Sequence, residues 1–427
     1  MSKAFTETRS ISTVIKYYIH VIFALFLILS CCERPKENPF EPESDVPAPV
    51  DLMLEFLNNK VKLYWNTKDI TDFKGYRLYK AIDSKDNISL LTELPAETKT
   101  FTDTSLQYYH WYFYRVSVLG YDVESKPSSY VKIYPGPSQV WILSQMGYSI
   151  HQYSHDIQHK RNIYNTQSPP TNWDLNHDQK QIWLTYAYSS SIGKVDLQTG
   201  YVDGYSLVNF TKPVDIKWDN LKKRSVILDQ SKRMIFFFDG QSIVDSLALN
   251  SGSYFKLQLS SNSDIGALSD SNAIIYLVDS NTPRKISFDD GYVGQDLIFC
   301  DNNLYILTAN SSTGQSIIIK YDIRNNEQEE LIINGIFKQV RKIVNCDYFW
   351  IIEKTEQYYK CVKLSETGER LIEIASLISV TDIQINPFDQ SLIVVERYND
   401  RILLFDSLGK NISENSQVYD PIKVLIQ

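Results

Sequence analysis

The clearest copy of an internal repeat reads Val380-Thr-Asp-Ile-Gln-Ile-Asn-Pro-Phe-Asp-Gln-Ser-Leu-Ile-Val-Val-Glu-Arg-Tyr-Asn-Asp-Arg-Ile-Leu-Leu-Phe-Asp-Ser-Leu-Gly409. An Asp-Ile pair opens a first apolar run, a polar turn leads to a second run, and a third run ends in Phe-Asp. Runs of this length, rich in β-branched residues and separated by turn residues, are typical of strands. The unit therefore predicts short antiparallel strands joined by polar turns.

Related units recur from Pro137 to the end of the chain. The apolar residue that opens each unit recurs every 41 residues on average, to within about ten, at Leu175, Ile216, Ile265, Leu297, Ile343, Ile383 and Ile422. The strand that ends the motif recurs at Val195-Asp196, Phe238-Asp239, Phe288-Asp289, Tyr321-Asp322, Leu364-Ser365 and Phe405-Asp406, with Tyr153-Ser-His-Asp156 as a degenerate first copy. A period in this range with four short strands per unit predicts the blades of a β-propeller.

The two ends of the repeat region favour a closed ring over a solenoid, which would need capping repeats. The unit that begins Gln139-Val-Trp-Ile-Leu143 lacks an opening strand, whereas Pro421-Ile-Lys-Val-Leu-Ile426 is an opening strand without the rest of a unit. Placing the C-terminal strand innermost in the first blade gives a seven-bladed β-propeller over residues 137–427 and removes free sheet edges. Six or eight blades stay open as alternatives, because the fourth and fifth units are irregular.

One stretch of the last unit carries a family resemblance. Residues Asn399 to Gly409 follow the pattern Asn-x-Arg-Ile-x-x-Phe-Asp-x-x-Gly, which resembles the NHL repeat. The other units match this pattern more loosely, so the region as a whole resembles the wider group of NHL-like or YVTN-like β-propellers.

The N-terminus has the pattern of an export signal. Lys3, Arg9 and Lys16 precede the apolar run Val21-Ile-Phe-Ala-Leu-Phe-Leu-Ile-Leu29, which is shorter than the span of about 20 residues that crosses a membrane. Ile28-Leu-Ser-Cys31 resembles the lipobox of bacterial lipoproteins, which implies a signal peptide over 1–30 and lipidation of Cys31. An uncleaved signal anchor, an ordinary secretory peptide and modification at Cys32 are the alternatives.

Residues 31–46 contain proline and charged residues without apolar periodicity, which predicts an extended tether. Together with the lipobox, the tether leads us to expect a protein of the cell envelope that is attached to a membrane by its lipid. The expected membrane is the outer membrane, on its periplasmic or its surface side.

Residues 47–135 predict a separate sandwich of short alternating strands. Val61-Lys-Leu-Tyr-Trp65, Gly75-Tyr-Arg-Leu-Tyr79 and Tyr112-Phe-Tyr-Arg-Val116 resemble the second, third and late strands of a fibronectin type III domain, with Trp65 as its core tryptophan. This resemblance implies a spacer or a docking unit. Tyr108-Tyr-His-Trp-Tyr112 is either a sugar-stacking surface or a set of buried strand aromatics.

Charge and cysteine content exclude two classes of protein. The net charge of -8 comes without a basic patch, which argues against binding to nucleic acid. Beyond Cys31 and Cys32 the chain has only Cys300, Cys346 and Cys361. Three cysteines cannot all pair with one another, so the fold does not depend on a disulfide framework.

The repeat predicts a ring of carboxylates at one mouth of the propeller channel. The residue before the opening apolar position is acidic in five units, at Asp174, Asp215, Asp264, Asp296 and Asp382, while Lys342 and Pro421 occupy it in the other two. Carboxylates gathered in this way favour a cation such as Ca²⁺, or a Lys or Arg side chain of a partner. The local alternative is that these Asp residues cap backbone N–H groups.

Loops between the second and third strands are expected on the same face as this ring. They carry aromatic and arginine residues of the kind that forms interface hot spots, namely Tyr186, Tyr188, Arg233, Arg284, Tyr358, Tyr398 and Arg401. Scattered, solvated loop residues are the alternative interpretation.

The sequence gives little support to a metal site formed by histidines or to a familiar catalytic motif. His151, His155 and His159 are four residues apart, which on a strand separates neighbouring side chains by about 13 Å, too far for one metal ion. The sequence lacks Gly-x-Ser-x-Gly, His-Glu-x-x-His and phosphate-loop motifs. We therefore expect a non-catalytic binding or scaffolding module that engages an envelope protein or glycan through one propeller face. The alternative is a propeller hydrolase or lyase with a metal at the pore mouth.

Overall fold

The structure is a computed structural model that describes residues 50–57, 60–67, 73–121, 123–176, 178–205, 210–278, 283–342 and 347–427. The predicted signal peptide, Cys31 and the tether lie outside these residues. The chain divides into two compact units, Met1–Ile133 and Tyr134–Gln427. Across the described ranges, no helix is long and apolar enough to cross a membrane.

Nearly all regular structure in the described residues is β. A single turn of 3-10 helix, η1 (Lys85–Asn87), is the one helical element found there. The all-β class that the sequence predicts is therefore confirmed.

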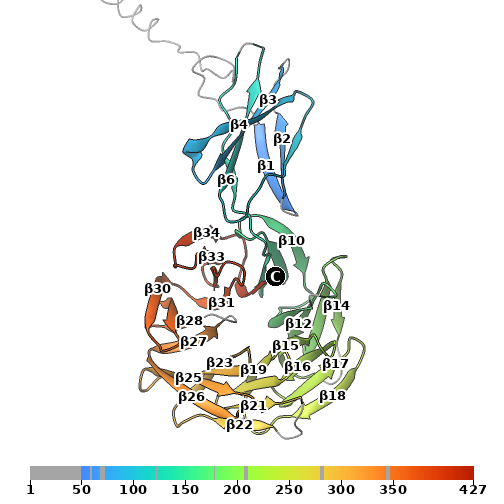
Figure 1. Cartoon of the computed structure of the whole chain (residues 1–427). Coiled ribbons are helices and arrows are strands. Elements are labelled where there is room, and N and C mark those ends of the chain that lie inside the picture. Colours follow the sequence, from blue (N-terminus) through green and yellow to red (C-terminus); the bar gives the residue numbers. More distant parts are fainter. Residues whose placement is uncertain are drawn as a thin grey trace, which may run out of the picture. The chain divides into compact units, whose positions relative to one another are not determined.

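The first unit contains two antiparallel sheets, with strand orders β1-β2-β5 and β4-β3-β6-β7 (Figure 1). The strands are β1 (Val50–Leu57), β2 (Lys60–Thr67), β3 (Gly75–Ile82), β4 (Ser89–Pro95), β5 (Thr100–Asp103), β6 (Tyr112–Leu119) and β7 (Val131–Ile133). Alternate residues of these strands point into a shared core, in which Trp65 and Tyr76 meet edge to face at 5.4 Å between ring centroids.

A buried polar group ties the strands of this unit together. Asp103 lies 2.7 Å from Lys80 Nζ and accepts a hydrogen bond from the Tyr114 hydroxyl at 2.7 Å. Burial would raise the pKa of Asp103, but hydrogen bonds from Lys80 and Tyr114 outweigh it and hold the pKa below its usual value. In the neighbouring aromatic cluster Tyr112 is buried, while Tyr108 and Tyr109 are partly exposed.

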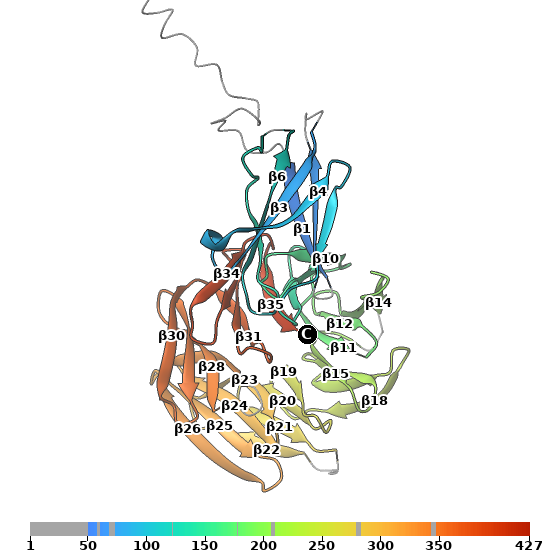
Figure 2. The same cartoon turned by 45° about the horizontal axis from the view of Figure 1, so that its top comes forward.

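The second unit is built from sheets of four antiparallel strands, seven of them among the described residues. Figures 1 and 2 show these sheets arranged around a common centre. In six of them the strands follow chain order from the innermost to the outermost. The first three of these sheets are β11 (Asn172–Asn176), β12 (Gln181–Tyr186), β13 (Ser191–Asp196) and β14 (Val202–Tyr205); β15 (Pro213–Asp219), β16 (Arg224–Asp229), β17 (Met234–Phe238) and β18 (Ile243–Ala248); and β19 (Tyr254–Leu259), β20 (Ile265–Ser269), β21 (Asn272–Tyr276) and β22 (Arg284–Ser287). The next three are β23 (Val293–Cys300), β24 (Asn303–Asn310), β25 (Gln315–Asp322) and β26 (Glu327–Asn334); β27 (Ile336–Arg341), β28 (Tyr348–Lys354), β29 (Tyr359–Ser365) and β30 (Arg370–Leu377); and β31 (Val380–Ile385), β32 (Leu392–Glu396), β33 (Arg401–Phe405) and β34 (Asn411–Asn415).

The seventh sheet joins the two ends of the unit. Its order is β10-β9-β8-β35, with β8 (Val140–Ser144), β9 (Ser149–Tyr153), β10 (Lys160–Asn165) and the C-terminal β35 (Pro421–Ile426). The backbones of Gln139 and Gln427 exchange two hydrogen bonds beside the β35–β8 pair, at 2.9 and 3.0 Å. The C-terminal strand thus pairs with the first strand of the unit, as the sequence pattern predicts.

Apolar clusters fill the spaces between neighbouring sheets. Each of seven clusters draws its buried side chains from two adjacent sheets, and one of them joins the last sheet to the first through Ile393, Ile402, Val140 and Val424. Because each sheet buries both of its faces against neighbours, the strands are rich in continuous apolar runs.

The repeated aromatic-Asp pair has a structural explanation. The carboxylates of Asp196, Asp239, Asp322 and Asp406 each accept two backbone N–H groups from the turn between the third and fourth strands. The motif is therefore a turn cap that stabilises each sheet.

In one sheet the sequence prediction assigned the wrong strand as the innermost one. Ile265 was predicted to open a unit, but it begins β20, the second strand of its sheet, and the innermost strand is β19. With Leu257 at the opening position, the residue before it, Lys256, takes the place predicted for Asp264. Because Ile265 was predicted as the opening residue in place of Leu257, the fourth and fifth units had irregular spacing in the sequence.

Candidate functional site

The innermost strands share a local irregularity that points a polar residue toward the centre. In six of these strands, as far as they are described, the register shifts by one residue near the start, as between Pro213 and Asp215. Such bulges re-aim the residue that follows. We call the residues at this position the inner ring: Asn172, Asp215, Lys256, Asp296, Gln339, Asp382 and Lys423.

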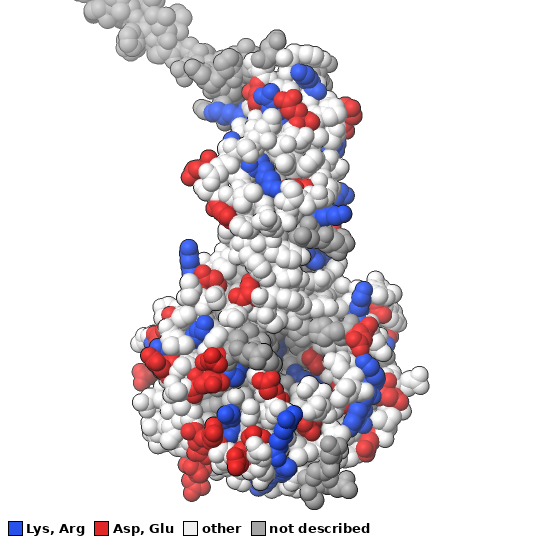
Figure 3. Space-filling model, in the orientation of Figure 1, with Lys and Arg blue, Asp and Glu red and all other residues white. Residues whose placement is uncertain are grey.

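A second ring lies two residues further along each innermost strand, because side chains on a strand alternate between its two faces. Its members are Asp174, Lys217, Gln258, Ile298, Arg341, Gln384 and Leu425. All seven line a central cavity of about 570 Å³, together with Asn172, Lys256, Asp382 and Lys423 of the inner ring. Figure 3 shows the second unit hollowed near its middle, with acidic and basic atoms interspersed around the hollow.

Carboxylates of the inner ring connect neighbouring sheets. Asp215 Oδ2 accepts the backbone N–H of Leu257 at 2.7 Å, Asp296 Oδ2 accepts that of Val340 at 3.1 Å, and Asp382 Oδ2 accepts that of Val424 at 3.0 Å. In each case the donor belongs to the innermost strand of the next sheet. The second ring repeats this contact once, between Asp174 and the backbone N–H of Trp218 at 2.7 Å.

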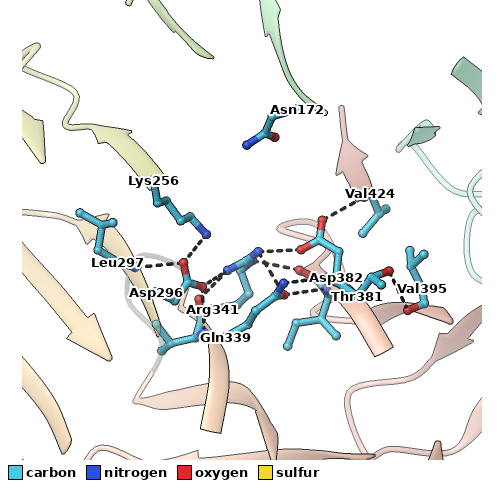
Figure 4. A network of polar contacts seen from close by, with 12 residues as sticks. Asn172, Lys256, Asp296, Leu297, Gln339, Arg341, Thr381, Asp382, Val395 and Val424 are labelled. Atoms are coloured by element: carbon cyan, nitrogen blue, oxygen red, sulfur yellow. Dashed lines mark hydrogen bonds and ion pairs between the residues drawn. The ribbon is translucent and has the colours of Figure 1, made fainter. Parts of the chain in front are cut away.

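Arg341 is the most highly connected cation of the two rings (Figure 4). Its guanidinium lies 2.7 Å from Asp296 and 2.7 Å from Asp382, and it donates to the Ile383 carbonyl at 2.9 Å. Lys256 forms a further ion pair with Asp296. Two of the predicted carboxylates, Asp296 and Asp382, are therefore held by cations of the same chain.

The electrostatics of the rings follow from burial and these pairings. Burial would raise the pKa of Asp296, but the charges of Lys256 and Arg341 hold it below its usual value. Burial lowers the pKa of Lys256 to about 8 although Asp296 opposes the shift, and the charges of Arg341 and Lys423 add to the lowering. Burial raises the pKa of Asp174, against the opposing charge of Lys217.

The structure corrects the predicted ring of five carboxylates. Asp215, Asp296 and Asp382 occupy equivalent positions, but Asp174 belongs to the second ring and Asn172 takes the inner position of its strand. Asp264 lies in the β19–β20 hairpin, where it accepts hydrogen bonds from Val278 N and Ser260 Oγ. Lys342 and Pro421 do not complete the ring either. Gln339 and Lys423 occupy those positions.

The two rings consequently carry no excess of negative charge. Four carboxylates are matched by four cations, which are Lys217, Lys256, Arg341 and Lys423. Within the described part of the chain, no group of three or more His, Cys, Asp or Glu residues is arranged to hold a metal ion. The expected repulsion among five carboxylates, and with it the argument for Ca²⁺, does not apply to this geometry.

A cluster of exposed, mostly aromatic residues lies at one edge of three neighbouring sheets. This edge is opposite to the one that carries the hairpins between the innermost and second strands. We call it the tyrosine face and define it by five side chains from the β8–β9, β12–β13 and β32–β33 turns and the segment before β35: Met146, Tyr148, Tyr188, Tyr398 and Tyr419. Tyr398, Tyr188 and Tyr419 are 81%, 79% and 62% exposed. Because strands alternate in direction, these turns and the segment entering an innermost strand share one edge of the unit.

Arg397 organises the tyrosine face. It forms an ion pair with Asp420 at 2.5 Å and donates to Gln145 Oε1 at 3.0 Å, while Asp420 accepts the Met146 backbone N–H at 3.0 Å. The hydrogen bond from Arg397 to Asp420, and the charge of that carboxylate, raise the pKa of Arg397 above its usual value. A polar network thus holds the loops that present the exposed rings.

Other predicted loop residues separate into three groups. Arg233 and Tyr358 do lie in second-to-third-strand turns, of other sheets. Tyr186 was expected on this surface but is buried in the core between two sheets. Arg284 begins the outermost strand β22 and donates to Ile323 O at 2.8 Å, and Arg401 is paired with Glu396. These two arginines are framework residues.

The three histidines of the predicted comb have separate partners. His151 shares a hydrogen bond with Ser149 at 2.9 Å. His155 is buried between Ser138 Oγ, at 2.6 Å, and Asp389, at 3.1 Å. His159 lies 3.8 Å from Asp156. Each histidine therefore supports local structure instead of converging with the others on one point.

Sequence reasoning missed the cations of the cavity and part of the tyrosine face. The period of two along a strand could have identified Lys217 from Asp215, and Arg341 from Gln339. The contribution of Met146 and Tyr419 depends on the pairing of β35 with β8 and has no local signal. Correct phasing of the fourth unit would have identified Lys256.

Comparison with solved structures finds similar folds at low sequence identity. A 6-phosphogluconolactonase-like protein of Bacteroides fragilis has a TM-score of 0.54 at 12% identity, covering 68% of this chain and 98% of that one. A protein of unknown function from Desulfotomaculum acetoxidans has a TM-score of 0.53 at 10% identity, covering 68% and 99%. Hydrazine synthase of Kuenenia stuttgartiensis has a TM-score of 0.53 at 10% identity, covering 69% and 93%.

Sequence comparison adds no family. No protein-family model matches the chain, and no curated protein matches it. The likeness to solved structures, together with radially arranged four-stranded sheets closed by β35 on β8, identifies the second unit as a β-propeller.

Proposed function

We propose that this chain is an envelope lipoprotein, attached through Cys31, in which a fibronectin type III-like domain precedes a seven-bladed β-propeller that binds a protein partner without catalysis. The tyrosine face is the observation that carries the binding function. Its rings belong to three neighbouring blades, and they are exposed, whereas about half of the aromatic side chains in the described residues are buried.

The chemistry of this face favours a protein over other partners. Tyrosine, methionine and arginine are enriched in protein interfaces, where rigid aromatic rings bury a large area at a small entropic cost. Arg397 and Asp420 add charged groups whose geometry is already set by their mutual ion pair. A preorganised face of this kind loses little conformational entropy on binding.

The domain assignments rest on the same residues in sequence and structure. Trp65 and Tyr76 pack in the core of the first unit, and the Tyr114 hydroxyl bonds to Asp103, in keeping with a fibronectin type III-like sandwich. Seven interfaces between adjacent sheets, one of them closing the ring, support seven blades. Because Asp296 and Asp382 are both paired with Arg341, they argue against a hydrolase or lyase that uses a metal at the pore mouth.

Site-specific photo-crosslinking in cells tests the partner. A crosslinking amino acid is placed at Tyr398, and a matched control is placed at Tyr201, which is 66% exposed on the turn between β13 and β14, away from the tyrosine face. We expect one protein adduct from position 398 only, and we expect the purified partner to bind the wild type but not a Tyr188→Ala/Tyr398→Ala variant. Equal adducts at both positions, or binding of a glycan by the same face, would contradict the proposal.

A separate experiment tests the anchor. Cells are labelled with an alkyne fatty acid, and we expect label on the wild-type chain and none on a Cys31→Ser variant, which should also leave the membrane fraction. Label that persists in Cys31→Ser and is lost in Cys32→Ser would move the anchor by one residue. Absence of label from the wild type would remove the lipoprotein assignment while leaving the tyrosine face untouched.

A further inference from the structure

Two lysines in the central cavity have ammonium groups without a close partner. Lys217 of β15 and Lys423 of β35 both line the cavity. Within the described part of the chain, neither ammonium forms a hydrogen bond or a close ion pair. A charged group that is largely removed from water is costly unless a counter-charge or an acceptor meets it. Both groups therefore have unused donors that face the cavity.

Two of the carboxylates near these lysines are already engaged. Asp382 uses one oxygen for Arg341 and the other for the Val424 backbone N–H. Asp215 accepts from the Leu257 and Ile216 backbones and from Asn172. Together with Asp174 they act on Lys217 through their charge, and within the described residues none of them forms a close ion pair with either ammonium.

Cations from four blades line the cavity beside the carboxylates of the two rings. Burial and the charge of Arg341 would lower the pKa of Lys217, but the charges of Asp215 and Asp174 hold it above its usual value. Burial lowers the pKa of Lys256, and the charges of Arg341 and Lys423 add to that shift, so cations from four blades lie within electrostatic reach of one another. Burial raises the pKa of Asp174, against the opposing charge of Lys217.

The remaining polar groups suit the uncharged part of a small molecule. Gln258 and Gln384 of the second ring line the cavity, and an amide can both donate and accept hydrogen bonds. The cavity volume of about 570 Å³ is in the range of small-molecule sites.

We propose that the central cavity binds a small organic anion, whose carboxylate or phosphate group accepts hydrogen bonds from Lys217 and Lys423 while Gln258 and Gln384 bind its polar remainder. The proposal concerns the channel of the propeller and is independent of the tyrosine face, because the two sites share no residue.

Calorimetric titration of the purified full chain in detergent tests this site with four matched probes: glycerate, glycerol 3-phosphate, glycerol and ethanolamine. We expect one of the two anions to bind at one site per chain, and the identity of that anion distinguishes a carboxylate from a phosphate ligand. Lys217→Met and Lys423→Met should each weaken binding about tenfold or more. Lys410→Met, at an exposed position outside the cavity, should leave the affinity unchanged.

Three results overturn the proposal: no anion binds at millimolar concentration, glycerol or ethanolamine binds as well as the anions, or both cavity variants keep the wild-type affinity. If either variant fails to fold, acetylation of wild-type lysines with mass spectrometric detection gives the same answer. The bound anion should then protect Lys217 and Lys423 but not Lys410, and equal modification of all three with and without the anion counts against the site.

Discussion

Arg341 Nη1 lies 2.7 Å from Asp296 Oδ2, and both side chains are buried in the centre of the propeller. The same guanidinium reaches Asp382 on the following blade. A single arginine therefore links three innermost strands. If it were removed, Asp382 would lose its ion pair and Asp296 would keep only Lys256.

Arg341→Met should lower the free energy of unfolding of the propeller by about 3–5 kcal/mol, the usual cost of leaving buried charges without a partner. Urea unfolding followed by tryptophan fluorescence measures this change. A second variant, Arg341→Met/Asp296→Asn, should recover part of the loss because it also removes a buried charge. Asp296→Asn alone completes the double-mutant cycle. If it destabilises the Arg341→Met variant by as much as it destabilises the wild type, the two residues are not coupled as the geometry indicates.

Asp215→Ala removes hydrogen bonds from two blades at once. The Leu257 and Ile216 backbone N–H groups would lose their charged acceptor in a buried site, and the expected loss of stability is about 3 kcal/mol. The matched control is Asp406→Ala, which removes a turn cap nearer the surface and should cost about 1 kcal/mol. Equal losses in the two variants would show that the contact between blades adds nothing to the local cap.

The sequence was sufficient for the all-β class and the β-propeller architecture because the repeat has a strong physical cause. Each blade buries both faces and turns sharply between strands, so apolar runs and capping Asp residues recur at a nearly constant interval. The pairing of β35 with β8 could also be predicted, because a unit without an opening strand and an opening strand without a unit complete each other.

The sequence was not sufficient for the functional residues, because their positions depend on register. Asp264 and Ile265 match the local motif at β20 better than Lys256 and Leu257 match it at β19, so local similarity selected the wrong strand. Asp174 matched the motif as well, although Asn172 occupies the inner ring. A shift of two residues keeps a side chain on the same face of a strand and moves it to another ring, a difference that periodicity alone does not resolve.

His151 makes the propeller sensitive to acid. Burial lowers its pKa to about 4, and the nearby charge of Lys160 adds to the shift. In the unfolded chain a histidine titrates near 6.5, so between about pH 6.5 and 4 the unfolded state binds a proton that the native state does not. Stability from this source is fully present above pH 6.5 and is lost as the pH falls through that window.

The expected loss due to His151 is about 3 kcal/mol at pH 4 relative to neutral pH. His151→Phe should remove this part of the pH dependence, while the contribution of the carboxylates stays common to both proteins. Urea unfolding of the two proteins at a series of pH values gives the difference between the slopes. Parallel curves from pH 4 to 7 would mean that His151 takes up its proton in the native state as readily as in the unfolded chain.

The C-terminal strand should control the stability of the whole ring. Truncation after Asp420 removes β35, and with it the Val424 side chain between the first and last blades and the backbone N–H that Asp382 accepts. The first blade would then have an open inner edge, and we expect a large decrease in melting temperature and rapid proteolysis in the β8–β10 region. A synthetic peptide with the sequence of residues 421–427 should restore protection when added to the truncated chain, whereas a peptide of scrambled sequence should not. A truncated chain that melts like the wild type would show that the interfaces between the other blades hold the ring together without this strand.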